Sequence, residues 1–563
     1  MVPVYNKVRL KTNPYDEAKA LGAFYTDVQI AEFLVWWGIQ DKNAKVIDPC
    51  FGGGVFLRAA CKRIKELGGL PEKQVYGVEI DEEIFSNIVF KLRDEFNVPK
   101  KNFIKGDFFE VGFRFEKGID TLVGNPPFIR YQSFSGNVRK KALREALKRG
   151  VRLSRLTSSW APFLINSAGI LKNGGRLAMV VPFEIVYALY AKPVLEFLSK
   201  SFEKITLLTF KEKLFPGLSE NTCLLLAENK GMRTEEIKMY DLVSAGYLNN
   251  IMRNGCLPKK INKNIKVENI NNNKERFAEY FIPKKTRELY GKLKNSDKTE
   301  NLNSVANVGI GYVTGGNDFF HLGQDDINKW GIPKKSLKRA VRRAKAFKGL
   351  KFTEEDWSEA LLNGYGAYLL LVKKIGSIPD SVKSYIAYGE KNGVNKSYKC
   401  RTRDPWFSVP HVYCPEGFLT YMTGLTPRIV TNEARVVAPN TLHVIRVLPE
   451  VRFDIFNLVT LSQTSLTLLS AELEGHVLGG GMLKLEPSEA GNLLFVSRNI
   501  KADILEGIGE EIDNLIRNDE PAKALFLADE IILKKGMGLT RDDCKLLRNG
   551  LQTLRNRRYH TAG

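Results

Sequence analysis

The chain has 563 residues, a length that predicts more than one domain, and its 44% of hydrophobic residues can build sizeable cores. Its 85 Lys and Arg residues outnumber its 63 Asp and Glu residues, which gives a formal net charge of +22. This excess favours a polyanionic partner, most often a nucleic acid, over a protein that is merely basic and soluble.

The seven cysteines are scattered along the chain and form no CxxC pair. This pattern predicts reduced thiols in a cytoplasmic protein, with neither a disulfide framework nor a zinc site. Residues 1–19 mix Lys, Asp and Pro and contain no apolar signal core. No apolar run approaches the roughly 18 residues needed to span a bilayer, so we expect no membrane partner.

The first predicted elements form a helix and then a strand–turn–helix unit. Residues 22–25 are expected to be extended, and Thr26 or Asp27 can cap a helix whose apolar residues recur on one face. A strand follows at residues 45–48 and ends in Asp48, before a glycine-rich turn and a helix over about residues 55–67. This order brings backbone amides close to a ligand, although tight strand–helix turns also use glycine.

Three further strands also end in polar side chains. Residues 75–81 carry Glu79 at a strand end, where a carboxylate can hold both ribose hydroxyls. The stretch 103–109 offers Asp107 as an acceptor for an amino group, and the fourth strand, at 121–123, leads into Asn125. Four such strand ends predict a doubly wound α/β domain that binds its ligand at this edge. The turn DPCFGGG differs from GxGxxG, which argues against a dinucleotide-dependent dehydrogenase.

The fourth strand runs into Gly124-Asn-Pro-Pro-Phe128, an unusual way to end a strand. Two prolines remove two backbone donors and fix two φ angles, so the carbonyls beside them are held in set directions. An amide side chain precedes this corner and an aromatic ring follows it. The combination suits a planar base with an exocyclic amino group, whereas the alternative is a strand-ending turn with a packed Phe.

The next hundred residues are expected to complete this domain. The stretch after residue 132 is basic and helical, and we interpret it as a phosphate-contacting segment, with a solvated helix face as the alternative. A helix at 160–171 and a buried strand at 174–183 follow. Residues 205–210 and 223–227 are predicted to pair as antiparallel strands, with an aromatic-bearing loop at 214–217 between them.

The second half of the chain has a different character. Residues 259–274 are rich in Lys, Asn and Ile and are expected to form a linker or surface loop. The stretches 334–351 and 396–409 are strongly basic, and the second interleaves cations with aromatics on β-like segments. These suit a duplex-facing surface, with a solvated β face as the alternative. Residues 309–320 form a glycine-rich strand and loop, 478–487 a loop, and 503–563 helices.

With these motifs in order, the chain resembles the gamma-class, TaqI-like N6-adenine DNA methyltransferases of bacterial restriction–modification systems. The match covers about residues 20–230, where GAFYT, DPCFGGG, GVEID, GDFF, NPPF and the FPG loop occur in the order of that class. The later stretches GYVTGGNDFF, CRTRDPWFSVP, GGGMLKLEP and LRNRR resemble the target-recognition half of long members. The implied α/β fold is a Rossmann-like class I S-adenosylmethionine-dependent methyltransferase domain with a C-terminal α+β target-recognition domain and a helical tail. The expected boundaries are 1–235 for the catalytic domain, 236–300 for a connecting segment, 301–500 for target recognition and 501–563 for the helical segment.

The resemblance also implies roles for individual residues. It places Phe24, Tyr25 and Thr26 at the methionine end of S-adenosylmethionine, and Asp48 with the turn of Pro49, Cys50, Gly52 and Gly54 beside the methionine and sulfonium. Glu79 would bind the ribose, Asp107 and the Phe108 backbone the adenine, and Ile80 and Phe163 would sandwich that ring. Asn125 and Pro126, followed by Pro127, would hold the target amino group, with Phe128 and Phe215 stacking on the target base. The residues expected to contact DNA are Arg130, Arg342, Arg343, Arg401, Arg403 and Trp406, and no metal is implied.

The implied activity is methyl transfer from S-adenosylmethionine to N6 of an adenine that is flipped out of a defined duplex DNA sequence. The implied setting is the interior of a bacterial or archaeal cell, with double-stranded DNA as partner, a separate cognate restriction endonuclease as a second one, and a monomeric chain. Phe51 stands where the class usually has Cys, and Asp27 where it usually has Pro, which puts local packing in doubt. The alternatives are an rRNA or protein-glutamine methyltransferase with the same motif, an inactive DNA-binding specificity subunit, and a fused nuclease. Residues 1–20 and 501–563 leave little room for a nuclease fold.

Overall fold

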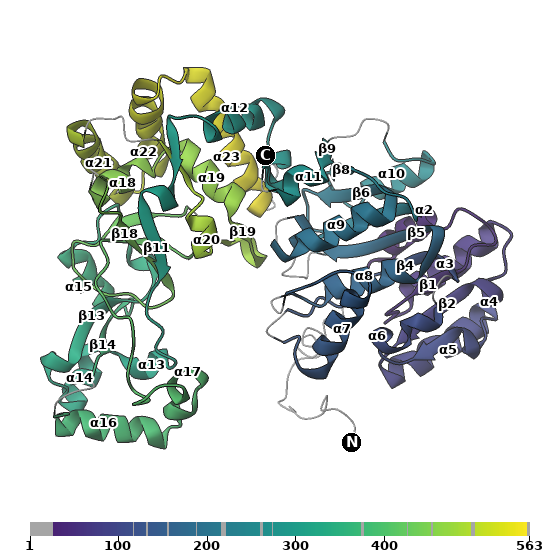
Figure 1. Ribbon diagram of the computed structural model, residues 1–563, viewed down its shortest axis with the longest axis horizontal. Helices are drawn as coiled ribbons and strands as arrows, with labels where there is room; N and C mark the ends of the chain where they lie inside the picture. The colour runs from purple at the N-terminus through teal and green to yellow at the C-terminus, as the bar shows by residue number, and fades with distance from the viewer. Residues whose placement is uncertain are drawn as a thin grey trace. The chain divides into compact units, whose positions relative to one another are not determined.

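The computed structural model describes residues 26–115, 118–130, 133–154, 157–186, 189–215, 221–258, 263–272, 274–372, 377–424, 426–451, 454–496 and 502–559. The chain divides between Phe281 and Ile282 into two compact units (Figure 1). Within the described ranges, every helix is too short or too polar to cross a bilayer.

Unit 1 is built around a nine-stranded sheet with the order β3-β2-β1-β4-β5-β7-β6-β8-β9. The first five strands of this order are parallel, β7 is antiparallel to both of its neighbours, β8 is parallel to β6, and β9 is antiparallel to β8. The central strands are buried along nearly their whole length, as expected where helices cover both faces. The strands are β1 Val46–Asp48, β2 Val75–Glu79, β3 Phe103–Lys105, β4 Ile119–Gly124, β5 Leu171–Pro182, β6 Phe202–Phe210, β7 Thr222–Lys230, β8 Glu236–Leu242 and β9 Lys263–Lys266.

Two groups of packed helices lie on the faces of this sheet (Figure 1). One group contains α2 Val28–Gly38, α3 Val55–Glu66, α5 Glu82–Phe96 and α10 Tyr247–Arg253. The other contains α7 Gly136–Lys148, α8 Trp160–Ile170, α9 Lys192–Ser201 and α11 Val267–Asn271. The short helices α4 Pro71–Gln74 and α6 Phe108–Val111 precede β2 and follow β3. The predicted doubly wound α/β architecture is confirmed.

The sheet brings the predicted polar residues to one edge. Asp48 and Glu79 are the last residues of β1 and β2, Asp107 follows β3, and Asn125 follows β4. Because these four strands are parallel neighbours, their carboxyl ends lie at the same edge of the sheet. The predicted antiparallel pairing of 205–210 with 223–227 is also confirmed, by β6 and β7.

The prediction of a linker or surface loop at residues 259–274 is wrong. Residues 263–266 form β9, which pairs with β8 at the edge of the sheet, and residues 267–271 form α11. Because this stretch is mostly polar, its composition did not indicate the edge strand or the helix. The few apolar residues of both elements face inward. Ile265 is fully buried opposite Ile237, and Val267 and Ile270 are also buried.

Unit 2 combines small antiparallel sheets with helices. The four-stranded sheet has the order β11-β18-β15-β17, and the three-stranded sheets have the orders β12-β14-β13 and β16-β20-β19, beside the pair β10-β21. The strands are β10 Thr299–Asn301, β11 Ala306–Ile310, β12 His321–Leu322, β13 Leu337–Val341, β14 Gly366–Leu370, β15 Gly417–Thr420, β16 Met422–Thr423, β17 Ile429–Thr431, β18 Leu442–Val447, β19 His476–Val477, β20 Leu483–Lys484 and β21 Leu494–Val496.

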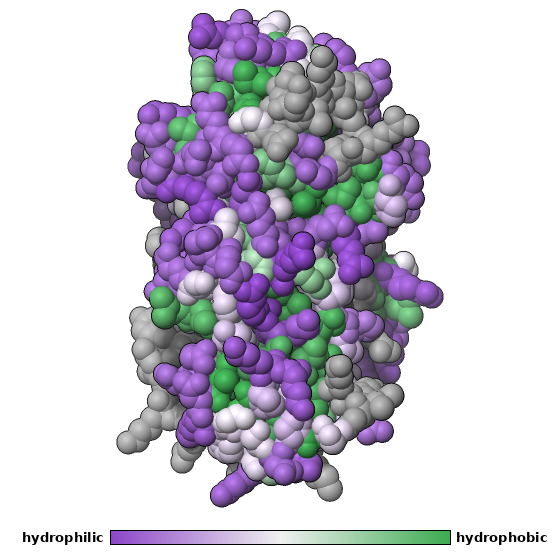
Figure 2. All heavy atoms as spheres, turned by 90° about the vertical axis from the view of Figure 1, so that its left-hand side faces the viewer, coloured by the Kyte–Doolittle hydropathy of each residue, from purple (hydrophilic) through white to green (hydrophobic). Residues whose placement is uncertain are grey.

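The helices of unit 2 flank these sheets and form its C-terminal part. They are α12 Lys284–Lys294, α13 Asn317–Phe320, α14 Gln324–Trp330, α15 Glu354–Leu362, α16 Asp380–Lys391, α17 Tyr398–Arg401, α18 Ile455–Leu461, α19 Ser465–Glu474, α20 Pro487–Ala490, α21 Ala502–Arg517, α22 Pro521–Ala528 and α23 Arg541–Tyr559. The prediction of helices after residue 503 is confirmed. Figure 2 shows one face of the molecule, where hydrophilic side chains predominate and apolar ones form smaller separate areas.

Two predictions for this unit need correction. Residues 396–409 are not β-like: residues 398–401 form the one-turn helix α17, because Cys400 turns into the core while its neighbours are exposed. The expected loop at 478–487 contains β20 and the start of α20. Apart from these two corrections, the segment 236–300, which was expected to connect the domains, carries β8 and β9 of unit 1 as well as α12 of unit 2.

The basic C-terminal sequence LRNRR is anchored inside unit 2. The Arg558 guanidinium is fully buried and donates to both carboxylate oxygens of Glu472, at 3.0 Å and 2.9 Å. Arg555 lies 3.6 Å from the same carboxylate. The buried ion pair joins α23 to α19, so these arginines stabilise the unit and do not form a cationic tail.

We expect replacement of Arg558 by Met to lower the free energy of unfolding of this region by about 3 kcal/mol, because Glu472 is then buried without its bidentate partner. Hydrogen exchange of α19 and α23 as a function of urea concentration measures this. The double variant Arg558→Met with Glu472→Leu should regain part of the loss, since neither charge is left alone. Unchanged exchange in Arg558→Met would contradict the structural role of the pair.

Candidate active site

The turn after β4 holds the Asn125 amide in one orientation. Asn125 Nδ2 donates to Thr26 Oγ1 at 3.1 Å. Asn125 Oδ1 is buried and accepts no hydrogen bond from any described residue. Burying an acceptor without a donor costs roughly 1–3 kcal/mol, so such an atom in a native protein calls for an explanation. A ligand that donates a hydrogen bond here would provide one.

The carbonyl groups of the same turn are not equivalent. The Asn125 carbonyl accepts from the Cys50 thiol, with an Sγ–O distance of 3.4 Å, and the Pro127 carbonyl accepts from the Ser159 hydroxyl. Among the described residues, the Pro126 carbonyl accepts no hydrogen bond. The turn therefore presents two acceptors, Asn125 Oδ1 and Pro126 O, for which the described part of the chain supplies no donor.

Ser159, at the start of α8, fixes this turn and was missed by sequence reasoning. Besides donating to the Pro127 carbonyl, its Oγ accepts from the Ile129 amide at 2.8 Å, and its own amide donates to the Ile129 carbonyl at 3.0 Å. Three hydrogen bonds thus hold the backbone just after Pro126. No spacing or composition signal marks Ser159, because the contact joins segments about 30 residues apart.

The end of β1 packs tightly against the same turn. A Cβ atom added to Gly124 would lie 2.9 Å from Asp48 Oδ1, so only glycine lets the two strand ends approach this closely. Asp48 is buried and accepts from the Cys50 amide at 3.1 Å. Burial raises the pKa of Asp48 to about 8, and the nearby Glu79 adds to the rise.

Burial likewise raises the pKa of the Cys50 thiol well above its usual range, with smaller contributions from the charges of Asp48 and Glu79. The thiolate is the nucleophilic form of cysteine. Cys50 is therefore a weak hydrogen-bond donor that links the β1 turn to the Asn125 carbonyl, and it is not a nucleophile.

The glycine-rich turn after β1 is tied to the end of β2. Gly52 and Gly54 have φ angles of +44° and +74°, and an added Cβ at Gly54 would lie 2.6 Å from Ile88. The Gly52 amide donates to Glu79 Oε2 at 2.8 Å, while Glu79 Oε1 accepts from two amides of its own strand end. A carboxylate oxygen can accept two hydrogen bonds, so Oε2 retains capacity for a ligand hydroxyl.

The end of β3 provides an aromatic wall. Asp107 caps α6 by accepting from the Phe109 amide at 3.0 Å, and burial raises its pKa. The Phe108 ring packs on Phe163 with a centroid distance of 5.0 Å and an angle of 30° between the planes. On the neighbouring strand end, Ile80 is 58% exposed and thus available to a ligand.

The structure says less about the roles of the other residues predicted for this site. Phe128 and Phe215 are both buried in the core of unit 1. Phe24 and Tyr25 lie outside the described residues, as do residues 216–217 of the predicted FPG loop. Thr26 is described and contacts Asn125, and Asp27 caps α2 by accepting from the Gln29 amide at 2.8 Å. This cap explains why Asp serves at that position.

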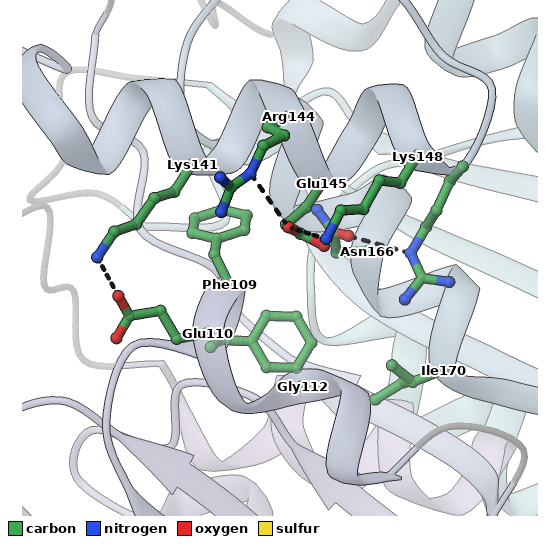
Figure 3. A pocket seen from close by; sticks show the side chains of 11 residues that line it. Phe109, Glu110, Gly112, Lys141, Arg144, Glu145, Lys148, Asn166 and Ile170 are labelled. Carbon is green, nitrogen blue, oxygen red and sulfur yellow. Dashed lines mark hydrogen bonds and ion pairs between the residues drawn. The ribbon is translucent and has the colours of Figure 1, made fainter.

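A cavity of about 430 Å³ lies between α6, α7 and α8 (Figure 3), and Phe108 is one of the residues that line it. Its basic residues come from the predicted phosphate-contacting segment, but several are paired within its walls. Lys141 pairs with Glu110, and Lys148 Nζ lies 2.8 Å from Glu145 Oε1. Figure 3 shows Arg144 and Lys148 converging on Glu145. Much of the positive charge of this cavity is therefore balanced internally.

The residues predicted to contact DNA differ in exposure. Arg130, Arg343 and Arg401 are exposed, whereas Arg342 is partly buried and lies 3.6 Å from Asp318. Two others have internal contacts. The Arg403 guanidinium donates to the Thr314 carbonyl at 2.6 Å and to the Val313 carbonyl. Trp406 packs against the core cluster that contains Phe319 and Phe320. The structure thus gives Arg403 and Trp406 a supporting role.

Comparison with known proteins identifies the class to which this fold and site belong. Residues 4–306 match the family N-6 DNA Methylase, and residues 274–533 match the family Type II methyltransferase M.Eco57I, C-terminal domain. The chain is 25% identical to Type II methyltransferase M.AccI of Acinetobacter calcoaceticus over 85% of its own length and 86% of that protein. It is 21% identical to Type II methyltransferase M.XamI of Xanthomonas campestris pv. amaranthicola over 84% of each chain.

Solved structures support the fold. The Type IIL restriction-modification enzyme MmeI, solved in complex with DNA, aligns with a TM-score of 0.57 and 13% identity over 96% of this chain and 80% of that one. The Type ISP restriction-modification enzyme LlaBIII, solved bound to DNA, aligns with a TM-score of 0.54 and 11% identity over 88% of this chain and 40% of that one. Unit 1 is thus a Rossmann-like methyltransferase domain.

Since the first family match covers more than half of the sequence, the chain belongs to the N-6 DNA methylase family. It is an adenine-specific DNA methyltransferase of restriction–modification type, as the motif order NPPF after DPCFGGG predicted. The family argues against the rRNA and protein-glutamine alternatives.

The raised pKa of Asp48 makes stability depend on pH. An Asp has a pKa near 3.9 in unfolded chains, so between about pH 5 and pH 8 the folded form binds the extra proton and stability falls as the pH rises. We expect Asp48→Asn, which keeps the shape and lacks the charge, to gain stability over the wild type as the pH rises from 5 to 8, by at most about 1.4 kcal/mol per pH unit. Urea unfolding followed by circular dichroism checks this. Parallel pH profiles for the two proteins would contradict the assignment.

Proposed function

We propose that the chain transfers a methyl group from S-adenosylmethionine to N6 of one adenine in a specific duplex DNA sequence, after flipping that adenine out of the helix. The observation that carries this proposal is the buried Asn125 Oδ1, which accepts no hydrogen bond from the described residues. The Pro126 carbonyl, in the same turn after β4, likewise accepts none from them. An adenine amino group has two hydrogens and matches two acceptors.

The strand ends that surround this turn fit S-adenosylmethionine. Glu79 has acceptor capacity for a ribose hydroxyl, and Gly52, where an added Cβ would meet no atom within 4 Å, leaves room for a ligand at the backbone of the turn. Asp48 is a buried carboxyl that a cation would ionise, and Asp107 with Phe108 would hold the adenine beside the exposed Ile80. When bound, this cofactor supplies an electrophilic methyl group on a cationic sulfur.

The turn can activate the amino group without a strong base. The lone pair of N6 is delocalised into the adenine ring, which makes the nitrogen a poor nucleophile. Hydrogen bonds to Asn125 Oδ1 and the Pro126 carbonyl would favour a pyramidal nitrogen with a localised lone pair. The same two acceptors stabilise the positive charge that develops on N6 as the methyl group is transferred. Because Ser159 and the prolines fix the turn, little reorganisation is needed.

The target base has to leave the duplex to reach this turn, at a cost of a few kcal/mol. Stacking on Phe128 and Phe215 would first require these buried rings to become accessible, and each contact would then return about 1–3 kcal/mol. The net charge of +22 supports binding to the DNA backbone. We propose that this chain acts as a monomer. A separate restriction endonuclease that cleaves the same sequence would be its functional partner.

Replacement of Asn125 by Ala should abolish most methyl transfer, because the variant loses the amide oxygen that accepts from the target amino group. The affinity for the cofactor should stay within a few-fold of the wild type, because the carboxylates at the strand ends are kept. Transfer of labelled methyl groups to duplex DNA and calorimetric titration of the cofactor measure the two properties. Transfer at wild-type rates in this variant would exclude the proposed role of Asn125.

Ser159 is proposed as a positioning residue, since it touches the backbone of the turn and not the reacting atoms. We expect Ser159→Ala to lower kcat roughly 10- to 100-fold, as expected when reacting groups are displaced by about 1 Å, with little change in KM for the cofactor. Ser159→Thr, which keeps the hydroxyl, should restore most of kcat. A loss of stability with unchanged kcat would show that Ser159 is only structural.

A further inference from the structure

An exposed cationic surface lies on unit 2 between the end of α16 and the end of α17. We call residues 391–402 the α17 surface. It comprises Lys391, the short helical turn Val394–Lys396, and α17 itself. Its exposed side chains are Lys391, Asn392, Lys396, Tyr398, Lys399, Arg401 and Thr402.

The cations of the α17 surface are not neutralised within the described part of the chain. No carboxylate of the described residues lies within ion-pair distance of Lys391, Lys396, Lys399 or Arg401. Other basic stretches differ: Arg339 pairs with Glu354, and Lys348 with Glu359. The acidic residues next to this surface in sequence are Glu390, which accepts from Trp406 Nε1 at 2.8 Å, and Asp404. The surface therefore keeps a net positive charge for a partner.

An aromatic side chain stands among these cations. Tyr398 is 66% exposed, and its ring centroid lies 5.8 Å from Lys399 Nζ and 5.4 Å from the Arg401 guanidinium carbon. The tyrosine hydroxyl can donate and accept hydrogen bonds, and a guanidinium offers donors in a planar fork. The pair thus offers directional contacts as well as charge.

The α17 surface is held firmly from beneath. Cys400 is fully buried, and its Sγ lies 3.6 Å from the Thr314 carbonyl, which also accepts from Arg403 at 2.6 Å. Gly315 has a φ of +88°, and an added Cβ there would lie 2.8 Å from the Lys399 Cβ. The glycine-rich sequence at 309–320 is thereby explained in part: it lets a loop pack directly under α17. The backbone that carries the exposed side chains is therefore fixed before a partner binds.

We propose that the α17 surface binds duplex DNA, with Lys391, Lys396 and Lys399 contacting phosphates and Tyr398 and Arg401 contacting base edges. This inference rests on the proposed function and specifies which residues determine the target sequence. Unpaired cations suit a phosphate backbone, and release of counterions drives such binding. Arginine donates in pairs to guanine O6 and N7 in the major groove, which makes Arg401 the residue that reads sequence most directly. Arg403 and Trp406 support this surface and do not face the DNA.

The test uses the full chain and compares variants of the α17 surface with a matched control. The variants are Tyr398→Ala, Arg401→Ala and Lys396→Ala, and the control is Lys545→Ala, an exposed lysine on α23. Sequencing of modified bases in DNA from cells that express each protein gives the methylated sequence. Titration of a fluorescent duplex at several salt concentrations gives the affinity and its salt dependence.

We expect Arg401→Ala and Tyr398→Ala to methylate a broader set of sequences than the wild type. Lys396→Ala should weaken binding to all duplexes alike and reduce the salt slope by about one. Lys545→Ala should match the wild type. An unchanged sequence and affinity in all three variants would overturn the proposal, and a change in affinity without any change in sequence would overturn the assignment of base contacts. If the wild type does not methylate DNA, the proposed function itself fails, which is a separate outcome.

Discussion

The site depends on one constraint: the backbone after β4 is fixed so that two acceptors point away from every described donor. Two prolines remove backbone donors there, Ser159 occupies the Pro127 carbonyl and both backbone groups of Ile129, and Thr26 Oγ1 accepts one hydrogen bond from the Asn125 side-chain amide. No donor among the described residues reaches Asn125 Oδ1, and burying such an acceptor costs free energy. In the proposed reaction the substrate amino group would supply that donor, and a hydrogen bond that strengthens in the transition state would assist catalysis.

The strand ends around this turn are coupled to it by close packing. Gly124 allows Asp48 to approach, the Cys50 thiol contacts the Asn125 carbonyl, and the Gly52 amide contacts Glu79. The proposed cofactor and target sites are therefore parts of one closely packed edge of the sheet. Burial raises the pKa of Asp48 to about 8, and a cationic ligand beside it would favour the ionised form.

Much of this edge could be predicted from sequence, because strand ends in a doubly wound sheet converge whatever the details of packing. Asp48, Glu79, Asp107 and Asn125 fall at such ends and were found. Ser159 and the pairing of Arg558 with Glu472 were not, since both join segments far apart in the chain and carry no local signal. The composition led to wrong predictions of secondary structure at two places, where the alternation of buried and exposed residues decides the structure. The Lys- and Asn-rich stretch around Ile265 is an edge strand, and the cations near Cys400 lie on a helical turn. Basic residues could be located from sequence, but only the structure separates exposed Arg401 from Arg403, which holds a neighbouring loop.

The central claim is that Asn125 Oδ1 and the Pro126 carbonyl hold the amino group of an extruded adenine. A structure of the chain with its duplex target and a cofactor analogue that lacks a transferable methyl group tests this most directly. The account predicts the adenine outside the helix, with N6 within about 3.2 Å of both oxygens. An adenine still stacked in the duplex, or an N6 held by other residues while Asn125 Oδ1 stays without a donor, would contradict it.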